Sequence, residues 1–206
     1  MNKTRILIAD DHSVVRAGIR ALLETESDFE VVGEAVNGLI AVKEAARLKP
    51  DVVIMDLMMP DMDGIETTAA LINVQPLSKI LILTTLGTSD GIARAFEAGA
   101  LGAIMKSAEF SELSDAVLTV ARGKRYVSKE ISRILADDPP LPLLSPRQLQ
   151  ILEAIVRGLT NPDISKALGI SMPTVTEHIT SIFKKLGVAN RAEAISTALQ
   201  KHLLKI

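Results

Sequence analysis

The first 122 residues alternate between short aliphatic runs and longer stretches whose apolar side chains recur at helical spacing. The aliphatic runs occupy residues 5–9, 30–35, 51–55, 79–84 and 102–105. The amphipathic stretches occupy residues 14–26, 39–48, 65–73, 91–98 and 109–121. Because buried strands and amphipathic helices alternate in this way in parallel sheets, the pattern predicts an α/β fold, a doubly wound domain of five βα units.

After residue 122 the pattern changes to a connector followed only by helices. Residues 127–136 have helical spacing, and residues 139–142 include three prolines, which favour an extended connector. Four more helical stretches occupy residues 146–157, 161–168, 172–186 and 191–201. The sequence therefore predicts an α/β domain over 1–122, a linker over 123–143 that could include a short helix, and a smaller all-α four-helix domain over 144–206.

The composition is that of a globular protein. The 206 residues are 48% hydrophobic and include no Cys, which excludes disulfide scaffolds, thiolate zinc sites and Cys nucleophiles. The first aliphatic run stops at Asp10, too early for a signal peptide, and no apolar segment approaches the roughly 18 residues of a membrane helix. We therefore expect a cytoplasmic protein that has no membrane partner.

Charge is divided unevenly between the two predicted domains. Residues 1–144 contain 15 Lys and Arg against 21 Asp and Glu, whereas residues 145–206 contain eight against four. The positive excess in the second domain is compatible with a polyanion such as nucleic acid. Only five aromatic residues are present, which argues against a stacking platform for single-stranded nucleic acid.

Five side chains with complementary chemistry fall at the predicted carboxyl ends of strands: Asp10, Asp11, Asp56, Thr84 and Lys106. Doubly wound sheets bind ligands at this edge, so we expect these groups in one pocket. Several carboxylates together suit Mg²⁺, and a carboxylate opposite that metal can attack a phosphoryl group. Thr84 and Lys106 would supply a hydroxyl and a cation for the phosphoryl oxygens. The alternative is structural, because Asp at a strand end commonly caps the next helix.

Residues 6–12 (ILIADDH), 53–60 (VIMDLMMP), 83–84 (LT) and 104–106 (IMK) together resemble the flavodoxin-like receiver domain of two-component response regulators. The resemblance implies that a sensor histidine kinase or a small phosphodonor phosphorylates Asp56. It also implies a Mg²⁺ site in which Asp11, Asp56 and the backbone carbonyl of Met58 contact the ion directly and Asp10 contacts it through water. Thr84 and Lys106 would then contact the phosphoryl oxygens.

One position departs from the receiver pattern. Many receivers have Tyr or Phe three residues before the lysine, where this chain has Ala103. We therefore expect any signal to pass through backbone shifts in the loops after Thr84 and Lys106. The same departure motivates an alternative function, in which the receiver is a phosphorylation-independent dimerisation or interaction module.

The stretch 172–186 predicts a DNA-reading helix. Its apolar residues form one stripe, while hydroxyls, one acid and cations occupy the other face, which suits either the major groove or plain solvation. The preceding stretch 161–168 and the turn at 169–171 complete a helix-turn-helix spacing.

The second domain resembles the LuxR-type helix-turn-helix. The resemblance rests on residues 144–147 (LSPR), 158–161 (GLTN), 184–188 (KKLGV) and 191–194 (RAEA) among others. Joined to a receiver, it corresponds to the NarL/FixJ subfamily, which implies double-stranded DNA as a partner and a homodimer in the active state. The residues we expect at DNA are Thr174, Thr176, Glu177, His178, Thr180, Ser181, Lys184, Lys185 and Arg191.

The second domain departs from its family at three positions. Gln148 stands where Glu is frequent, and Thr176 and Thr180 stand where basic residues are frequent. Fewer phosphate contacts should make DNA affinity fall less steeply with salt.

The two resemblances together predict a transcription factor controlled by Mg²⁺-dependent phosphorylation, not an enzyme. An aspartyl-phosphate phosphatase is the enzymatic alternative. It is disfavoured because Met58 stands two residues after Asp56, where a second carboxylate would be needed.

Overall fold

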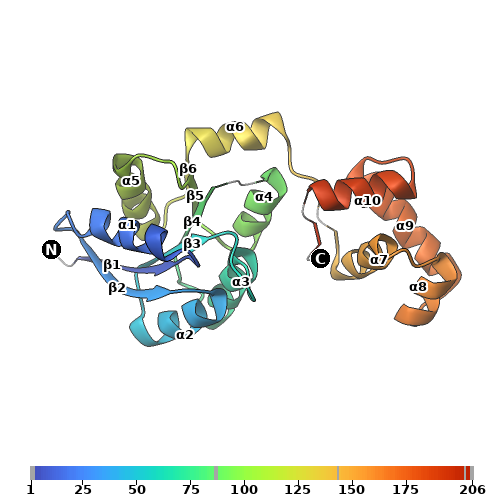
Figure 1. Cartoon of the computed structure of the whole chain (residues 1–206), viewed down its shortest axis with the longest axis horizontal. Coiled ribbons are helices and arrows are strands. Elements are labelled where there is room, and N and C mark those ends of the chain that lie inside the picture. Colours follow the sequence, from blue (N-terminus) through green and yellow to red (C-terminus); the bar gives the residue numbers. More distant parts are fainter. Residues whose placement is uncertain (1–2, 86–87, 143, 202, 205–206) are drawn as a thin grey trace. The chain divides into compact units, whose positions relative to one another are not determined.

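A computed structural model of the chain describes residues 3–85, 88–142, 144–201 and 203–204. The chain divides into two compact units, residues 1–139 and 140–206 (Figure 1). The first unit is an α/β structure and the second is helical. No helix within the described residues is long and apolar enough to cross a membrane.

The first unit is built on a six-stranded sheet in the order β2-β1-β3-β4-β5-β6, in which every pair is parallel. The strands are β1 (Thr4–Ala9), β2 (Phe29–Ala35), β3 (Val52–Asp56), β4 (Ile80–Thr84), β5 (Gly102–Met105) and β6 (Tyr126–Val127). The chain leaves β1 toward β2 on one side and returns to β3 on the other. The carboxyl ends of β1 and β3 therefore flank the switch point, where doubly wound sheets form their ligand crevice.

Helices cover both faces of this sheet, as Figure 1 shows. They are α1 (Ser13–Leu23), α2 (Gly38–Leu48), α3 (Gly64–Val74), α4 (Ser89–Glu97), α5 (Phe110–Ala121) and α6 (Lys129–Asp137). Alternate strand residues point to opposite faces, so Ile6 and Ile8 pack with α1 and α5, while Leu7 and Ala9 pack with the other helices. This alternation confirms the predicted α/β fold class.

The segment after residue 122 includes a short strand that the sequence pattern does not predict, followed by a helix. Tyr126–Val127 forms a sixth strand beside β5, and Ile131 of α6 is fully buried in the core cluster that contains Ala103. A two-residue strand is too short to show a period, so the sequence pattern could not reveal it. That residues 1–122 and 144–206 are the independent domains remains a prediction.

The described residues of the second unit form four helices: α7 (Pro146–Val156), α8 (Asn161–Leu168), α9 (Met172–Leu186) and α10 (Arg191–Gln200). Ser145, Thr160, Ser171 and Asn190 each cap the helix that follows through a side-chain oxygen. Gly169 ends α8 in the left-handed conformation and permits the tight turn into α9. The core includes Ile151, Ile155, Val175, Ile182 and Leu186.

Candidate functional site

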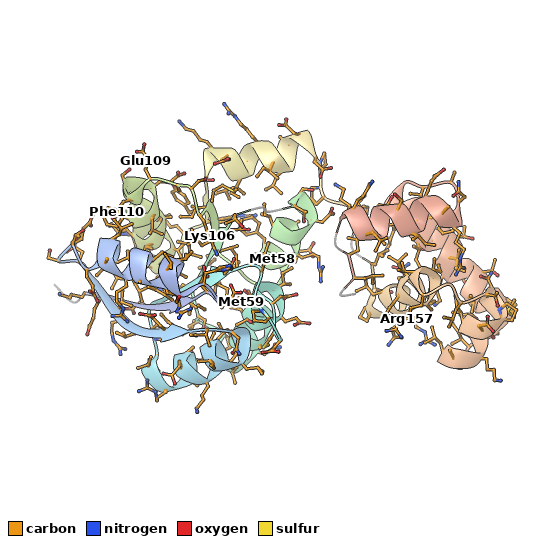
Figure 2. The ribbon with its side chains drawn as sticks, viewed as in Figure 1. Met58, Met59, Lys106, Glu109, Phe110 and Arg157 are labelled. Atoms are coloured by element: carbon orange, nitrogen blue, oxygen red, sulfur yellow. The ribbon has the colours of Figure 1, made fainter. Side chains whose placement is uncertain are left out.

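The carboxyl edge of the sheet brings together the polar side chains expected there, and Asp11 follows Asp10 in the same loop. Asp10 directly follows β1, Asp56 ends β3, Thr84 ends β4 and Lys106 directly follows β5. Figure 2 labels Lys106 and Met58, and both lie near this edge of the sheet. Met58 belongs to the loop after β3. The convergence arises because parallel strands place all their carboxyl ends at one edge.

Lys106 joins the two buried carboxylates of the edge. Its Nζ lies 2.6 Å from Oδ2 of Asp10 and 2.9 Å from Oδ2 of Asp56. Asp10 is 1% exposed and Asp56 is 4% exposed, so these charges are held almost without water. A buried charge is tolerated when an opposite charge accompanies it, and the ammonium serves both carboxylates at once.

Asp56 holds a proton more readily than a free aspartic acid side chain does. Burial raises the pKa of Asp56 above its ordinary value, and this effect outweighs the opposing hydrogen bond from Lys106. Burial by itself lowers the pKa of Lys106, but the carboxylates of Asp10 and Asp56 outweigh it, so that pKa ends above its ordinary value. The lysine therefore stays charged at neutral pH.

The carboxylates at this edge fit a divalent cation. Asp10, Asp11, His12 and Asp56 each place one ligand atom within 4.8 Å of the others. Nδ1 of His12 lies 2.7 Å from Oδ1 of Asp11, which draws an exposed ring toward the cluster. Three carboxylates are the hard oxygen donors that Mg²⁺ prefers. His12 is a member of the cluster to which the sequence analysis assigned no role.

Thr84 adds a buried hydroxyl that has no hydrogen-bond partner among the described residues. The residue is 1% exposed, and its backbone carbonyl accepts from the N–H of Lys106 at 2.7 Å. Buried hydroxyls are normally hydrogen-bonded, so this one has hydrogen-bonding capacity that no described residue uses.

Two local features keep the acidic loops in place. A Cβ at Gly64 would lie 2.2 Å from the carbonyl oxygen of Asp56, so only glycine lets α3 begin this close to β3. Arg16 donates to the carbonyl of Asp10 at 2.7 Å and to the carboxylate of Glu34 at 3.2 Å. The sequence showed no signal for Arg16, because its two partners lie in different elements.

Ala103 lies at the centre of β5 and is buried. Its carbonyl accepts from the N–H of Ser128, directly before α6, and Ile131 of α6 packs in the same cluster. The space near this position is thus filled by apolar groups from α6. The signalling route expected through the loop after Thr84 includes residues 86 and 87, which lie outside the described residues.

The second candidate site is the outer face of α9. An open hollow on this face is lined by Met172, Pro173, Thr176, Glu177, Thr180, Ser181 and Lys184. The hydroxyls of Thr176 and Thr180 donate to carbonyls one turn earlier in the helix, at 3.1 and 2.9 Å. The face therefore presents exposed polar groups around a shallow surface.

The remaining residues expected at DNA lie on the flanks of α9 or beyond it. Thr174, His178 and Lys185 are half-buried, and Nζ of Lys185 lies 2.9 Å from Oε1 of Gln148. The guanidinium of Arg191 donates to the carbonyls of Ile155 and Leu159, which ties α10 to the end of α7. A phosphate contact by Arg191 would compete with these bonds and stays a prediction.

Two family models match this chain. The family model described as "Response regulator receiver domain" matches residues 6–118, and "Bacterial regulatory proteins, luxR family" matches residues 142–198. "Response regulator protein VraR" of Staphylococcus aureus (strain NCTC 8325 / PS 47) is 36% identical over 206 residues, covering 98% of this chain and 99% of VraR.

Two solved structures are similar over nearly the full length. The response regulator ChrA of a heme-sensing two-component system has 39% identity and a TM-score of 0.60, covering 99% of this chain and 100% of ChrA. The response regulator RcsB in a complex with DNA has 28% identity and a TM-score of 0.68, covering 95% of this chain and 98% of RcsB.

Proposed function

Because this chain belongs to the response regulators that join a receiver domain to a LuxR-family DNA-binding domain, we propose that phosphorylation of Asp56 controls its binding to double-stranded DNA. The observation that carries this proposal is the contact of Lys106 with both buried carboxylates, Asp10 and Asp56. The buried hydroxyl of Thr84, which has no partner among the described residues, lies on the adjacent strand. A receiver needs an acceptor carboxylate, a cation and a hydroxyl donor in this arrangement.

In the proposed reaction, a carboxylate oxygen of Asp56 attacks the phosphorus of a phosphodonor. The bond from phosphorus to the donor breaks as the acyl phosphate forms, and the leaving group carries away the electron pair. A sensor histidine kinase or a small phosphodonor would supply the group. Mg²⁺ held by Asp10, Asp11, Asp56 and the Met58 carbonyl would neutralise phosphoryl charge.

The chain's own residues then hold the phosphoryl group. Lys106, which already contacts Oδ2 of Asp56 at 2.9 Å, would pair with a phosphoryl oxygen. The Thr84 hydroxyl, which has no partner among the residues that the structure describes, would donate to another oxygen. Both groups come from strands adjacent to each other in the sheet, so their response can reach the neighbouring loops.

At the DNA site, α9 would enter the major groove. Glu177 would accept from a cytosine amino group, and the methyl groups of Thr176 and Thr180 would meet thymine methyls, since their hydroxyls are bound to the helix backbone. Lys184 and Lys185 would neutralise phosphates. Ser181 on the outer face of α9, Thr174 and His178 on its flanks, and Arg191 on α10 complete the proposed contact set.

The active species would be a homodimer. Leu199 on α10 is 47% exposed although the helix otherwise buries Ala194 and Ala198 in its own unit. A symmetric pair of α10 helices would cover this residue and place two α9 helices on two half-sites.

The test is a DNA-binding titration of the full chain with Mg²⁺, in the presence and absence of beryllofluoride as a phosphoryl mimic. We expect the mimic to raise DNA affinity by roughly five- to 100-fold, which corresponds to a coupling of about 1–3 kcal/mol. Equal affinities in both conditions would contradict phosphorylation control and favour the alternative module, for which the buried Ala103 is the supporting observation.

Replacing Thr84 with Val should separate stability from signalling. Valine keeps the shape of threonine and removes a buried hydroxyl that has no partner among the described residues, so thermal unfolding should show unchanged or slightly higher stability, by about 1 kcal/mol. The gain in DNA affinity with beryllofluoride should be lost or reduced. A variant that is destabilised by several kcal/mol would show that the hydroxyl is already bonded.

A further inference from the structure

The hydrogen-bond partners of Gln148, in the first turn of α7, determine which way its side-chain amide faces. The residue is 6% exposed, and its Oε1 accepts from the N–H of Ser145 at 2.9 Å and from Nζ of Lys185 at 2.9 Å. An N–H and an ammonium can only donate, so the amide oxygen must face them. The NH₂ group therefore faces α9, where Nε2 lies 2.9 Å from Oγ of Ser181.

This orientation determines which way the Ser181 hydroxyl acts. Because its oxygen accepts from Gln148, its own proton remains available for an acceptor. Within the described part of the chain, Ser181 makes no donated hydrogen bond, in contrast to Thr176 and Thr180, whose hydroxyls donate to the helix backbone. Ser181 lines the open hollow on α9 together with Lys184.

We propose that Ser181 donates a hydrogen bond to a phosphate oxygen of duplex DNA, and that Gln148 is the positioning residue that keeps the hydroxyl in its donating orientation. The inference rests on the proposed function, which assigns α9 to DNA. Phosphate oxygens only accept hydrogen bonds, and the adjacent Lys184 and Lys185 provide the positive charge that attracts them. Base edges also carry acceptors, but the neighbouring ammonium groups favour the negatively charged backbone, so phosphate is the class of ligand that we propose.

A carboxylate at position 148 would reverse this arrangement. Carboxylate oxygens only accept, so the Ser181 hydroxyl would have to turn its proton inward and present a lone pair to the phosphate. The same change would place a negative charge 2.9 Å from the Lys185 ammonium. Gln148→Glu thus tests the polarity of the network with almost no change of shape.

The experiment measures binding of the full chain, with Mg²⁺ and beryllofluoride, to a labelled mixed-sequence duplex over a series of salt concentrations. For Gln148→Glu we expect roughly tenfold weaker binding at low salt and a shallower dependence of affinity on salt, by about one ion. Gln150→Glu is the matched control, because it adds the same charge to an exposed position of α7. Equal effects of the two variants would overturn the inference.

A second variant keeps the proposal testable if Gln148→Glu folds poorly. Ser181→Ala should bind duplex DNA roughly tenfold more weakly than the wild type. The factor should be the same on two duplexes of different sequence. Ser196→Ala, at an exposed position of α10, is the control. Wild-type affinity for Ser181→Ala, or a loss that depends on base sequence, would refute the phosphate contact. Failure of the wild-type chain to bind any duplex would instead refute the proposed function.

Discussion

Asp56→Asn should abolish formation of acid-labile phosphate on this protein. The amide lacks the nucleophilic carboxylate oxygen. Asp10 and Asp11 remain at the edge, but they follow β1 and do not occupy the acceptor position at the end of β3. With acetyl phosphate and Mg²⁺, intact-mass spectrometry should show the added phosphoryl mass on the wild type and none on the variant. The gain in DNA affinity with acetyl phosphate should disappear as well.

The loss should not come from unfolding. Burial raises the pKa of Asp56, which means that the folded chain disfavours the ionised carboxylate, so a neutral amide should not lower the melting temperature at neutral pH. Asp28→Asn is the matched control, because Asp28 is exposed in the loop before β2, away from the carboxyl edge. Phosphoryl mass on Asp56→Asn equal to that of the wild type would overturn the assignment of the acceptor.

Lys106→Met should destabilise the metal-free protein by about 3 kcal/mol. The ammonium lies 2.6 and 2.9 Å from the buried carboxylates of Asp10 and Asp56, and its removal leaves two like charges that face each other without compensation. Urea unfolding at neutral pH without Mg²⁺ measures the change in the free energy of unfolding. Lys124→Met, at an exposed position, should change this free energy by less than about 0.5 kcal/mol.

The destabilisation of Lys106→Met should depend on conditions in two ways. Mg²⁺ should restore part of the stability, since it binds the folded carboxylates and not the unfolded chain. Lowering the pH should also reduce the difference from the wild type, because the loss of the ammonium raises the pKa of Asp56 further and a protonated carboxyl needs no partner. A variant as stable as the wild type without Mg²⁺ would show that Lys106 does not compensate these charges.

The strand-end residues of the receiver site were predictable from the sequence, whereas Arg16 and His12 were not. Asp10, Asp56, Thr84 and Lys106 follow aliphatic runs, and parallel strands bring the ends of such runs to one edge, so their convergence follows from local pattern. The role of Arg16 does not, because its bonds to the Asp10 carbonyl and to Glu34 depend on how α1 packs against β2. His12 likewise joins the acidic cluster only through the fold of its loop.

In the second unit the helices were predictable and the polar network was not. Ser145, Ser171 and the glycines after α8 and α9 give caps that can be read along the chain. Gln148 and Ser181 are 33 positions apart, and their hydrogen bond exists only because α7 packs on α9. Nothing in the residue types indicates which end of the amide faces which helix.

By itself, the sequence determined the alternation of buried strands and amphipathic helices, the helix caps and the identity of the charged groups at the strand ends. These properties depend on neighbours within one or two turns, so short-range periodicity encodes them. The tertiary structure alone decided that Lys106 bridges Asp10 and Asp56, that Tyr126–Val127 extends the sheet, and that Gln148 orients Ser181. Each of these is a hydrogen bond or ion pair between distant segments, whose direction and distance are defined only when the elements have packed.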